Sequence, residues 1–170
     1  SDRYVPTEVN LPSGRTAVEI SAGYDYTCAI LDDGYVVCWG SNWRGKLGDG
    51  SQSDRSNPVY VSLTGGRTAI DIATGYRHTC AVLDNGSINC WGLYTLNDVS
   101  NVPVLPSHEL PENAISITLG TDTTHVTLED GSVVTWGSDD YGQLGNADNE
   151  EGDGVGGFGN DASYVEFPTG

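Results

Sequence analysis

The chain of 170 residues is poor in basic side chains and contains no methionine. Seven Lys and Arg residues stand against 24 Asp and Glu residues, which gives a formal net charge of −17. Binding to a DNA or RNA backbone requires a cationic face, because the release of counterions from the phosphates drives the association. The arginines and the single lysine, Lys46, lie scattered among acidic residues. The composition therefore predicts that the protein does not bind nucleic acid.

Long apolar runs are also missing. No stretch reaches the length of about 18 apolar residues that a membrane-spanning helix requires, so we expect no membrane span. The chain starts at Ser1 without a basic segment followed by an apolar one. We therefore expect that a signal peptide has been removed or was never part of this sequence.

Local catalytic motifs are absent as well. The sequence contains no G-x-S-x-G turn, no phosphate-binding glycine loop and no H-E-x-x-H helix. Its histidines are His78, His108 and His125, and the first and last fall near one repeated strand position in different units. A structural role for these side chains is the simpler interpretation. The sequence predicts a protein that is not an enzyme.

Glycine, by contrast, occupies 23 positions and accompanies an internal repeat. Three segments align and end in Trp-Gly: 14–40, 66–92 and 112–137. The spacing is 52 residues from Trp39 to Trp91 and 45 from Trp91 to Trp136. Four short strands at this period are typical of β-propeller blades.

Each unit has the same expected anatomy. An alternating strand leads to a glycine, a second strand leads to an Asp/Asn-Gly turn, and a third strand ends in Trp-Gly. A fourth strand is expected after each long loop, at 57–61, 102–105 and 163–167. Pro6, Val9, Leu11 and Gly14 repeat the spacing of Pro58, Val61, Leu63 and Gly66. The predicted fold class is all-β, with about three four-stranded propeller blades.

The repeated residues resemble a known family. The Trp-Gly ends, the G-Y-x-x-T-C-A starts and the loops at 43–50 and 141–146 are similar to repeats of the regulator of chromosome condensation family. The cysteines resemble those of its secreted prokaryotic members. The resemblance implies one propeller-repeat domain over 1–170, with repeats at about 4–55, 56–100 and 101–162 and a terminal strand at 163–170. The loop after Trp91-Gly92 departs from the pattern.

The four cysteines form two pairs with the same spacing. Counting outward from the turn at 32–34 places Cys28 opposite Cys38, and the same count places Cys80 opposite Cys90. The third unit replaces both positions together, with His125 and Thr135. A four-cysteine zinc site and free buried thiols are the alternatives. Disulfides are the favoured interpretation, and they imply an extracellular compartment.

Aromatic side chains near strand ends are the candidate partner-binding residues, because Tyr and Trp anchor protein interfaces. They are Tyr24, Tyr26, Trp43, Tyr76, Tyr94 and Tyr141. Secreted propellers that resemble these repeats include binders and inhibitors that use a loop-lined face. The alternative is that several of these side chains pack between blades, as we expect for Trp39, Trp91 and Trp136.

Two further motifs are weaker. Asp148, Glu150 and Asp153 lie among glycines, as in oxygen-ligand calcium loops, but the spacing is not that of an EF-hand. A solvated acidic loop is the simpler interpretation, so we expect no cofactor, and a bound calcium ion is the alternative. Asn85-Gly86-Ser87 is a glycosylation sequon in an expected hairpin turn, where Asn-Gly is also a favoured turn pair.

The repeat number raises a question about closure. Propellers of the resembled family close with about seven blades, so three blades leave apolar faces open. The chain is a fragment of a longer propeller, or copies close into a ring, or copies add head to tail. The leading hypothesis is an extracellular structural protein that self-assembles through a terminal strand containing Tyr164, Val165 and Phe167, without a blade of its own. The alternative is a secreted module that captures or inhibits a protein partner, and a nucleotide-exchange factor is disfavoured.

Overall fold

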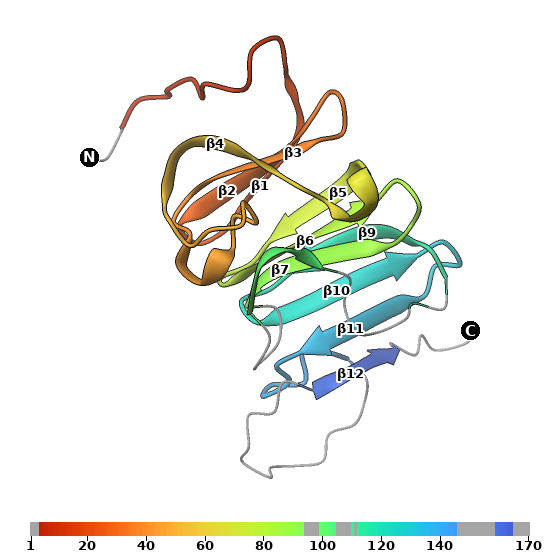
Figure 1. The fold of residues 1–170 in the computed structure, drawn as a ribbon. Helices are drawn as coiled ribbons and strands as arrows, with labels where there is room; N and C mark the ends of the chain where they lie inside the picture. Colours follow the sequence, from red (N-terminus) through yellow and green to blue (C-terminus); the bar gives the residue numbers. More distant parts are fainter. Residues whose placement is uncertain (1–3, 94–98, 105–109, 111, 146–158, 165–170) are drawn as a thin grey trace.

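The computed structural model describes residues 4–93, 99–104, 110, 112–145 and 159–164. Within these residues the strands form three four-stranded antiparallel sheets, each of which is one blade of a partial β-propeller (Figure 1). The predicted all-β fold class is confirmed. No helix among the described residues is long and apolar enough to cross a membrane.

Each blade uses four strands that are consecutive in the chain. Blade 1 contains β1 (Ala17–Ala22), β2 (Tyr26–Leu31), β3 (Val36–Gly40) and β4 (Arg55–Val61). Blade 2 contains β5 (Ala69–Thr74), β6 (His78–Leu83), β7 (Ile88–Leu93) and β8 (Val99–Val104). Blade 3 contains β9 (Ala114–Leu119), β10 (Thr123–Leu128), β11 (Val133–Gly137) and β12 (Gly159–Tyr164). Two short 3-10 turns, η1 (Trp43–Gly45) and η2 (Thr64–Gly66), lie before and after β4.

The central hairpin of each blade has the register that its turn predicts. Cys28 lies opposite Cys38 and Cys80 lies opposite Cys90, and both pairs are disulfide-bonded with Cα atoms 4.1 Å apart. His125 lies opposite Thr135 at the same place in blade 3. All four cysteines are buried, so the two bridges belong to the packed interior.

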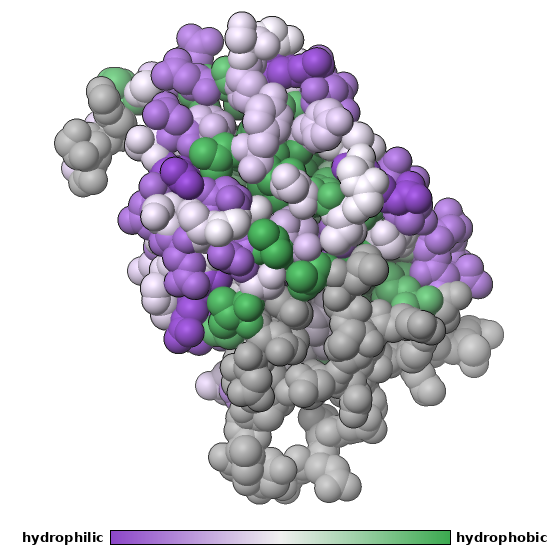
Figure 2. Space-filling view, in the orientation of Figure 1, coloured by the Kyte–Doolittle hydropathy of each residue, from purple (hydrophilic) through white to green (hydrophobic). Residues whose placement is uncertain are grey.

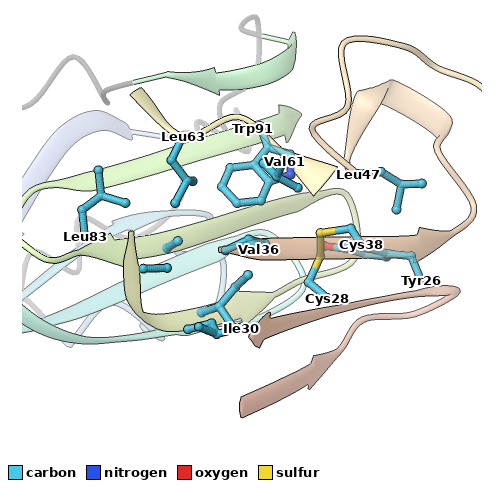
Figure 3. Close-up of a cluster of buried hydrophobic side chains, with 13 residues drawn as sticks. Tyr26, Cys28, Ile30, Val36, Cys38, Leu47, Val61, Leu63, Leu83 and Trp91 are labelled. Atoms are coloured by element: carbon cyan, nitrogen blue, oxygen red, sulfur yellow. A yellow bond between two sulfur atoms is a disulfide. The ribbon is translucent and has the colours of Figure 1, made fainter. Parts of the chain in front are cut away.

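The core lies between successive blades. One cluster joins Cys28, Ile30 and Cys38 of blade 1 to Ile72 and Trp91 of blade 2 (Figure 3). A second cluster joins blade 2 to blade 3 in the same way. Alternate residues of each strand point to opposite faces, so every blade presents one face to the blade before it and the other to the blade after it.

The first strands of the blades differ in how far this packing covers them. Ile20, Ile72 and Ile117 occupy the same repeat position in β1, β5 and β9. Ile72 and Ile117 are each 3% exposed, because the preceding blade covers them. Ile20 is 63% exposed, because no other blade among the described residues packs against this face. The three isoleucines therefore show how much of this side chain is exposed when no blade packs against it.

The N-terminal segment partly covers this face of blade 1. Leu11 packs, as Trp39 does, against the buried cluster of Ala29, Leu31 and Val37. Leu63, its counterpart one repeat later, packs between blades 1 and 2. Leu11 therefore takes the place that the end of a fourth strand takes elsewhere. Trp91 and Trp136 are buried between blades as expected, whereas Trp39 remains partly exposed.

The terminal strand is the fourth strand of blade 3, as the repeat predicts, and the expectation that Tyr164 lies in a strand without a blade of its own is wrong. β12 pairs with β11, and Tyr164 lies opposite Val134, although the strand covers 159–164 and not the expected 163–167. The reason is that each third strand has an open hydrogen-bonding edge, which the next extended segment of the chain fills. For the same reason β4 belongs to blade 1. The repeat boundary predicted after residue 55 places residues 56–61 in the second repeat instead. Val165 and Phe167 lie outside the described residues.

Candidate protein-binding surface

One end of the blades gathers most of the candidate aromatic residues. The β1–β2, β5–β6 and β9–β10 turns lie at this end, together with the loops that follow β3 and β11. Four exposed aromatic side chains occupy these segments: Tyr24, Trp43, Tyr76 and Tyr141. We call this group the aromatic end. The residues come from all three blades, so the surface depends on the blades being stacked.

Tyr24 and Tyr76 form the centre of the aromatic end. They occupy the same position in successive turns, and their rings meet edge to face with centroids 4.9 Å apart. Tyr24 is 76% exposed, so most of its ring is available to a partner. The turns border a cavity of about 310 Å³ whose lining includes Leu119 and Thr121 of blade 3. An exposed, pre-positioned aromatic pair beside a hollow is the kind of feature that anchors protein interfaces.

The turns come close because their first residue is glycine. A Cβ atom added to Gly23 would lie 2.7 Å from the backbone oxygen of Gly75, and one added to Gly75 would lie 2.7 Å from that of Gly120. Both distances are too short for any side chain. The glycine that follows each first strand therefore allows the close approach at which Tyr24 reaches Tyr76.

Positive charge is held beside the aromatic pair. The Arg77 guanidinium lies 5.2 Å from the centre of the Tyr76 ring and 3.8 Å from Asp122 Oδ1. The aromatic ring and the carboxylate together fix this side chain. The pair Trp43 and Arg44 repeats the motif, because the Arg44 guanidinium lies 4.9 Å from the Trp43 ring.

The loop that carries Trp43 is tied down from within. Asn42 is buried; its side chain donates to Asp49 Oδ1 at 3.0 Å and accepts from the Leu47 backbone at 3.0 Å. Partial burial raises the pKa of Asp49, but hydrogen bonds from Ser51 and Arg55 outweigh it and hold the pKa below its ordinary value. Trp43 therefore stands on a rigid base. In blade 3 Asp139 accepts from the Leu144 backbone at 2.8 Å in the same manner, beneath the exposed Tyr141.

The same loop connects blade 1 to blade 2. Leu47 is fully buried in the cluster that contains Trp91, and the backbone of Gly48 lies against the Trp91 indole. Lys46 is also buried; its ammonium group pairs with Asp25 and lies 5.0 Å from the Tyr26 ring. The loop is thus a structural clamp as well as a support for Trp43.

Tyr26 is not a partner-binding residue, contrary to the expectation from sequence. It is 4% exposed and donates a hydrogen bond to the backbone oxygen of His78 at 2.6 Å. Its repeat counterpart His78 is also buried, and His78 Nε2 lies 3.1 Å from Thr124 Oγ1 in blade 3. Burial raises the pKa of Tyr26 and lowers that of His78 to about 4. Both side chains link blades.

The structure describes only some of the remaining residues that the sequence singles out. Asn85 is exposed at the hairpin tip, where its Oδ1 accepts from the Ser87 hydroxyl at 2.7 Å, and its glycosylation stays a prediction. Tyr94 and the calcium candidates Asp148, Glu150 and Asp153 lie outside the described residues. Across the described part of the chain no group of three or more His, Cys, Asp or Glu side chains is placed to hold a metal ion.

Sequence reasoning missed an exposed aromatic pair at the opposite end of the blades. Tyr35 and Tyr60 have centroids 6.4 Å apart and perpendicular rings, above a cavity of about 420 Å³. One signal was present in the sequence. The turns of the second and third units have Ser87 and Ser132 where the first has Tyr35, so the fold does not require a tyrosine there.

Comparison with known proteins identifies the repeat. Profiles of the regulator of chromosome condensation (RCC1) repeat match residues 33–82, and residues 17–45 and 69–96. The matched residues lie in blades 1 and 2, which are RCC1-type repeats. The ultraviolet-B receptor UVR8 of Arabidopsis thaliana is 30% identical over 156 residues, which are 87% of this chain and 35% of UVR8. The mouse ubiquitin-protein ligase HERC2 is 30% identical over 147 residues, 81% of this chain but 3% of HERC2.

Solved structures show the same RCC1-type fold. The yeast protein Prp20p superposes with a TM-score of 0.75 at 20% identity, over 91% of this chain and 37% of Prp20p. Human WBSCR16 superposes with a TM-score of 0.72 at 24% identity, over 81% of this chain and 36% of WBSCR16. The chain thus spans about a third of UVR8 and of these propellers. RCC1-type propellers typically serve as protein-binding modules.

Proposed function

We propose that this RCC1-type chain is a non-enzymatic, extracellular protein-binding module whose partner docks on the aromatic end. The observation that carries the proposal is the Tyr24–Tyr76 pair, exposed beside a cavity that all three blades border. Tyr and Trp side chains on a rigid base contribute large contact areas at a low entropic cost. Prp20p, which has the same fold, is described as binding Gsp1p and histones, and protein binding is the activity that we carry over.

Charge supports a particular kind of partner. With a net charge of −17 the protein repels other acidic proteins and attracts basic ones over distances of about a Debye length. Arg77 and Arg44 lie beside Tyr76 and Trp43 at the aromatic end, where each can pair with an isolated carboxylate. We propose a partner whose surface is basic overall, with acidic groups opposite these two arginines.

The extracellular location rests on the two disulfides. Cys28–Cys38 and Cys80–Cys90 are buried bridges in consecutive blades, and structural disulfides persist in oxidising compartments. This agrees with the secreted, cysteine-containing type that the sequence resembles. HERC2 is named as a ubiquitin-protein ligase, but we assign no ligase activity to this chain, because the match covers 3% of HERC2.

The test compares two ends of the same molecule. The Tyr24→Ser/Tyr76→Ser variant should lose binding of basic proteins captured from extracellular fluid, measured by quantitative mass spectrometry against the unaltered protein. The Tyr35→Ser variant, changed at the opposite end, should keep it. Equal capture by all three proteins would contradict the proposed surface. Circular dichroism of each variant establishes that the blades remain folded.

Self-association is a second candidate function, supported by the open face of blade 1. Ile20 is 63% exposed on a face that is covered in blades 2 and 3. We propose that a second copy covers it. The far face of blade 3 has Thr123, His125 and Thr127 where blades 1 and 2 have Tyr or His, Cys, and Ile or Val. A polar face gains little from packing against the apolar face of another copy, so we propose a closed pair through blade 1 instead of a head-to-tail filament.

Sedimentation velocity tests this second candidate. The unaltered protein should sediment as a dimer at micromolar concentration, and Ile20→Asp should sediment as a monomer. Ile70→Asp, at an exposed isoleucine of blade 2, is the matched control and should leave the dimer intact. A monomeric unaltered protein would rule out the pair, and a mass that grows without limit would restore the filament.

A further inference from the structure

A second hollow lies at the end of the blades opposite the aromatic end. The turn after β2, the end of β4 and η2 border a cavity of about 420 Å³. Val61 and Leu63, both buried, form its apolar floor, and the exposed rings of Tyr35 and Tyr60 form one wall. The size and this mixture of apolar and polar lining are typical of sites for small ligands.

The fold does not account for Tyr35. The same turn in blades 2 and 3 has Ser87 and Ser132, whose hydroxyls donate to Asn85 and Asp130 at 2.7 and 2.6 Å. Tyr35 gives up this hydrogen bond and places an aromatic ring in solvent. Such a replacement weakens the turn locally, so an exposed aromatic residue here is better explained by what it contacts outside the chain.

The two arginines at the hollow are each compensated by carboxylates. Arg15 lies 2.9 Å from Asp33 Oδ2 through Nε and 3.4 Å from Asp32 Oδ2 through Nη1. Arg67 Nη1 lies 3.2 Å from Asp84 Oδ1, which is outside the lining of the hollow. The rim therefore offers N–H donors beside carboxylate acceptors, and neither arginine is a free positive charge. A charged ligand gains little from such a rim, whereas a hydroxyl, which both donates and accepts, can bond to an arginine and a carboxylate together.

The polar groups on the wall of the hollow also suit a ligand that carries hydroxyls. Among the described residues the hydroxyls of Tyr35, Tyr60 and Ser62 form no hydrogen bond within the protein. The Tyr35 and Tyr60 rings are perpendicular to each other, and both residues line the hollow. A pyranose ring presents an apolar C–H face that stacks on an aromatic face, with hydroxyls around its perimeter.

We propose that this hollow binds a neutral saccharide, with one sugar ring stacked on Tyr35 or Tyr60 and its hydroxyls bonded to Arg15, Asp33 and Arg67. The site is separate from the aromatic end, so a protein partner and a saccharide would occupy opposite ends of the blades. A proline-rich peptide also packs between exposed tyrosines, but it lacks the hydroxyls that this rim selects.

Isothermal titration with cellohexaose, laminarihexaose and mannohexaose tests the site. At least one should bind the unaltered protein, and Tyr35→Ser should weaken that binding roughly tenfold, the equivalent of about 1.4 kcal/mol. Serine is the residue that the other two turns use, so this variant keeps a compatible turn. Tyr24→Ser, at the aromatic end, is the control and should bind the saccharide as the unaltered protein does.

Three results would overturn the proposal. They are the absence of binding by all three saccharides at the limit of their solubility, equal affinity in the Tyr35→Ser variant, and tighter binding of a proline decapeptide that Tyr35→Ser abolishes. Because the matched control lies at the other end, loss of saccharide binding and loss of protein capture are distinguishable. Either can fail while the other stands.

Discussion

The hydroxyl of Tyr26 in blade 1 lies 2.6 Å from the backbone oxygen of His78 in blade 2, the residue at its own position one repeat later. The Thr79 hydroxyl lies 2.9 Å from that of Tyr26 and 2.8 Å from the backbone oxygen of Lys46. His78 in turn meets Thr124 of blade 3 at 3.1 Å. One repeat position therefore links each blade to the next through a ring and a threonine.

Tyr26→Phe should destabilise the protein by about 0.5–1.5 kcal/mol, because it removes one buried hydrogen bond to the His78 oxygen, which then accepts from the Gly75 backbone alone. Tyr24→Phe is the matched control, two residues away in an exposed position, and should change the free energy of unfolding by less than about 0.5 kcal/mol. Urea denaturation followed by tryptophan fluorescence measures both. Equal effects would mean that the Tyr26 hydroxyl has no structural role.

The equivalent isoleucines predict a second contrast. Ile72→Ala should cost about 2–5 kcal/mol, because it leaves a cavity between blades 1 and 2. Ile20→Ala removes the same atoms from an exposed face and should cost under about 1 kcal/mol in a monomer. The same denaturation experiment distinguishes them. A large, concentration-dependent cost at Ile20 would show that a second molecule covers the open face.

Loss of one bridge has a calculable effect. Replacing Cys80 and Cys90 together by alanine should lower the free energy of unfolding by about 2–3 kcal/mol, as estimated from the loop that the bridge closes. Thiol titration of the denatured, unreduced protein should detect no free thiol. Free thiols in that assay would contradict both bridges and the extracellular location.

Stability should fall with rising pH around Glu19. Partial burial, followed by a hydrogen bond and the charge of Asp71, raises the pKa of Glu19 from 4.5 to about 7. The folded state holds this proton more tightly than the unfolded state, so its contribution is present below pH 4.5 and is lost as the pH rises through about 7. Urea midpoints from pH 4 to 8 should show this decline relative to Glu19→Gln. Parallel profiles would contradict the raised pKa.

Features that depend on residues close together in the sequence could be predicted, whereas contacts between residues far apart in the sequence could not. The Asp-Gly turn at 33–34 fixes the register of its hairpin, so the opposition of Cys28 and Cys38 follows from counting. β12 is joined to β11 by a long segment, and no turn sets its register, so the repeat predicts a fourth strand in blade 3 but not its bounds or its pairing with β11 residue by residue.

The burial of Tyr26 could not be predicted from the sequence either. Tyr24 and Tyr26 lie two residues apart after Gly23, at the start of a strand, and both positions are compatible with exposure. The close approach of blade 2, where Gly75 meets Gly23, buries one and leaves the other in solvent. The hollow beneath Tyr35 likewise depends on how β4 and the turn after β2 are placed together.

The buried position of Lys46 has a practical consequence. It is the only lysine in the chain, its side chain is 3% exposed, and its ammonium group is held by Asp25. Amine-directed reagents therefore meet almost no reactive side chain on the folded molecule, so biotin or a fluorophore attached this way would be directed to the α-amino group. Conversely, modification of Lys46 by such a reagent would report that the clamp between blades 1 and 2 has opened.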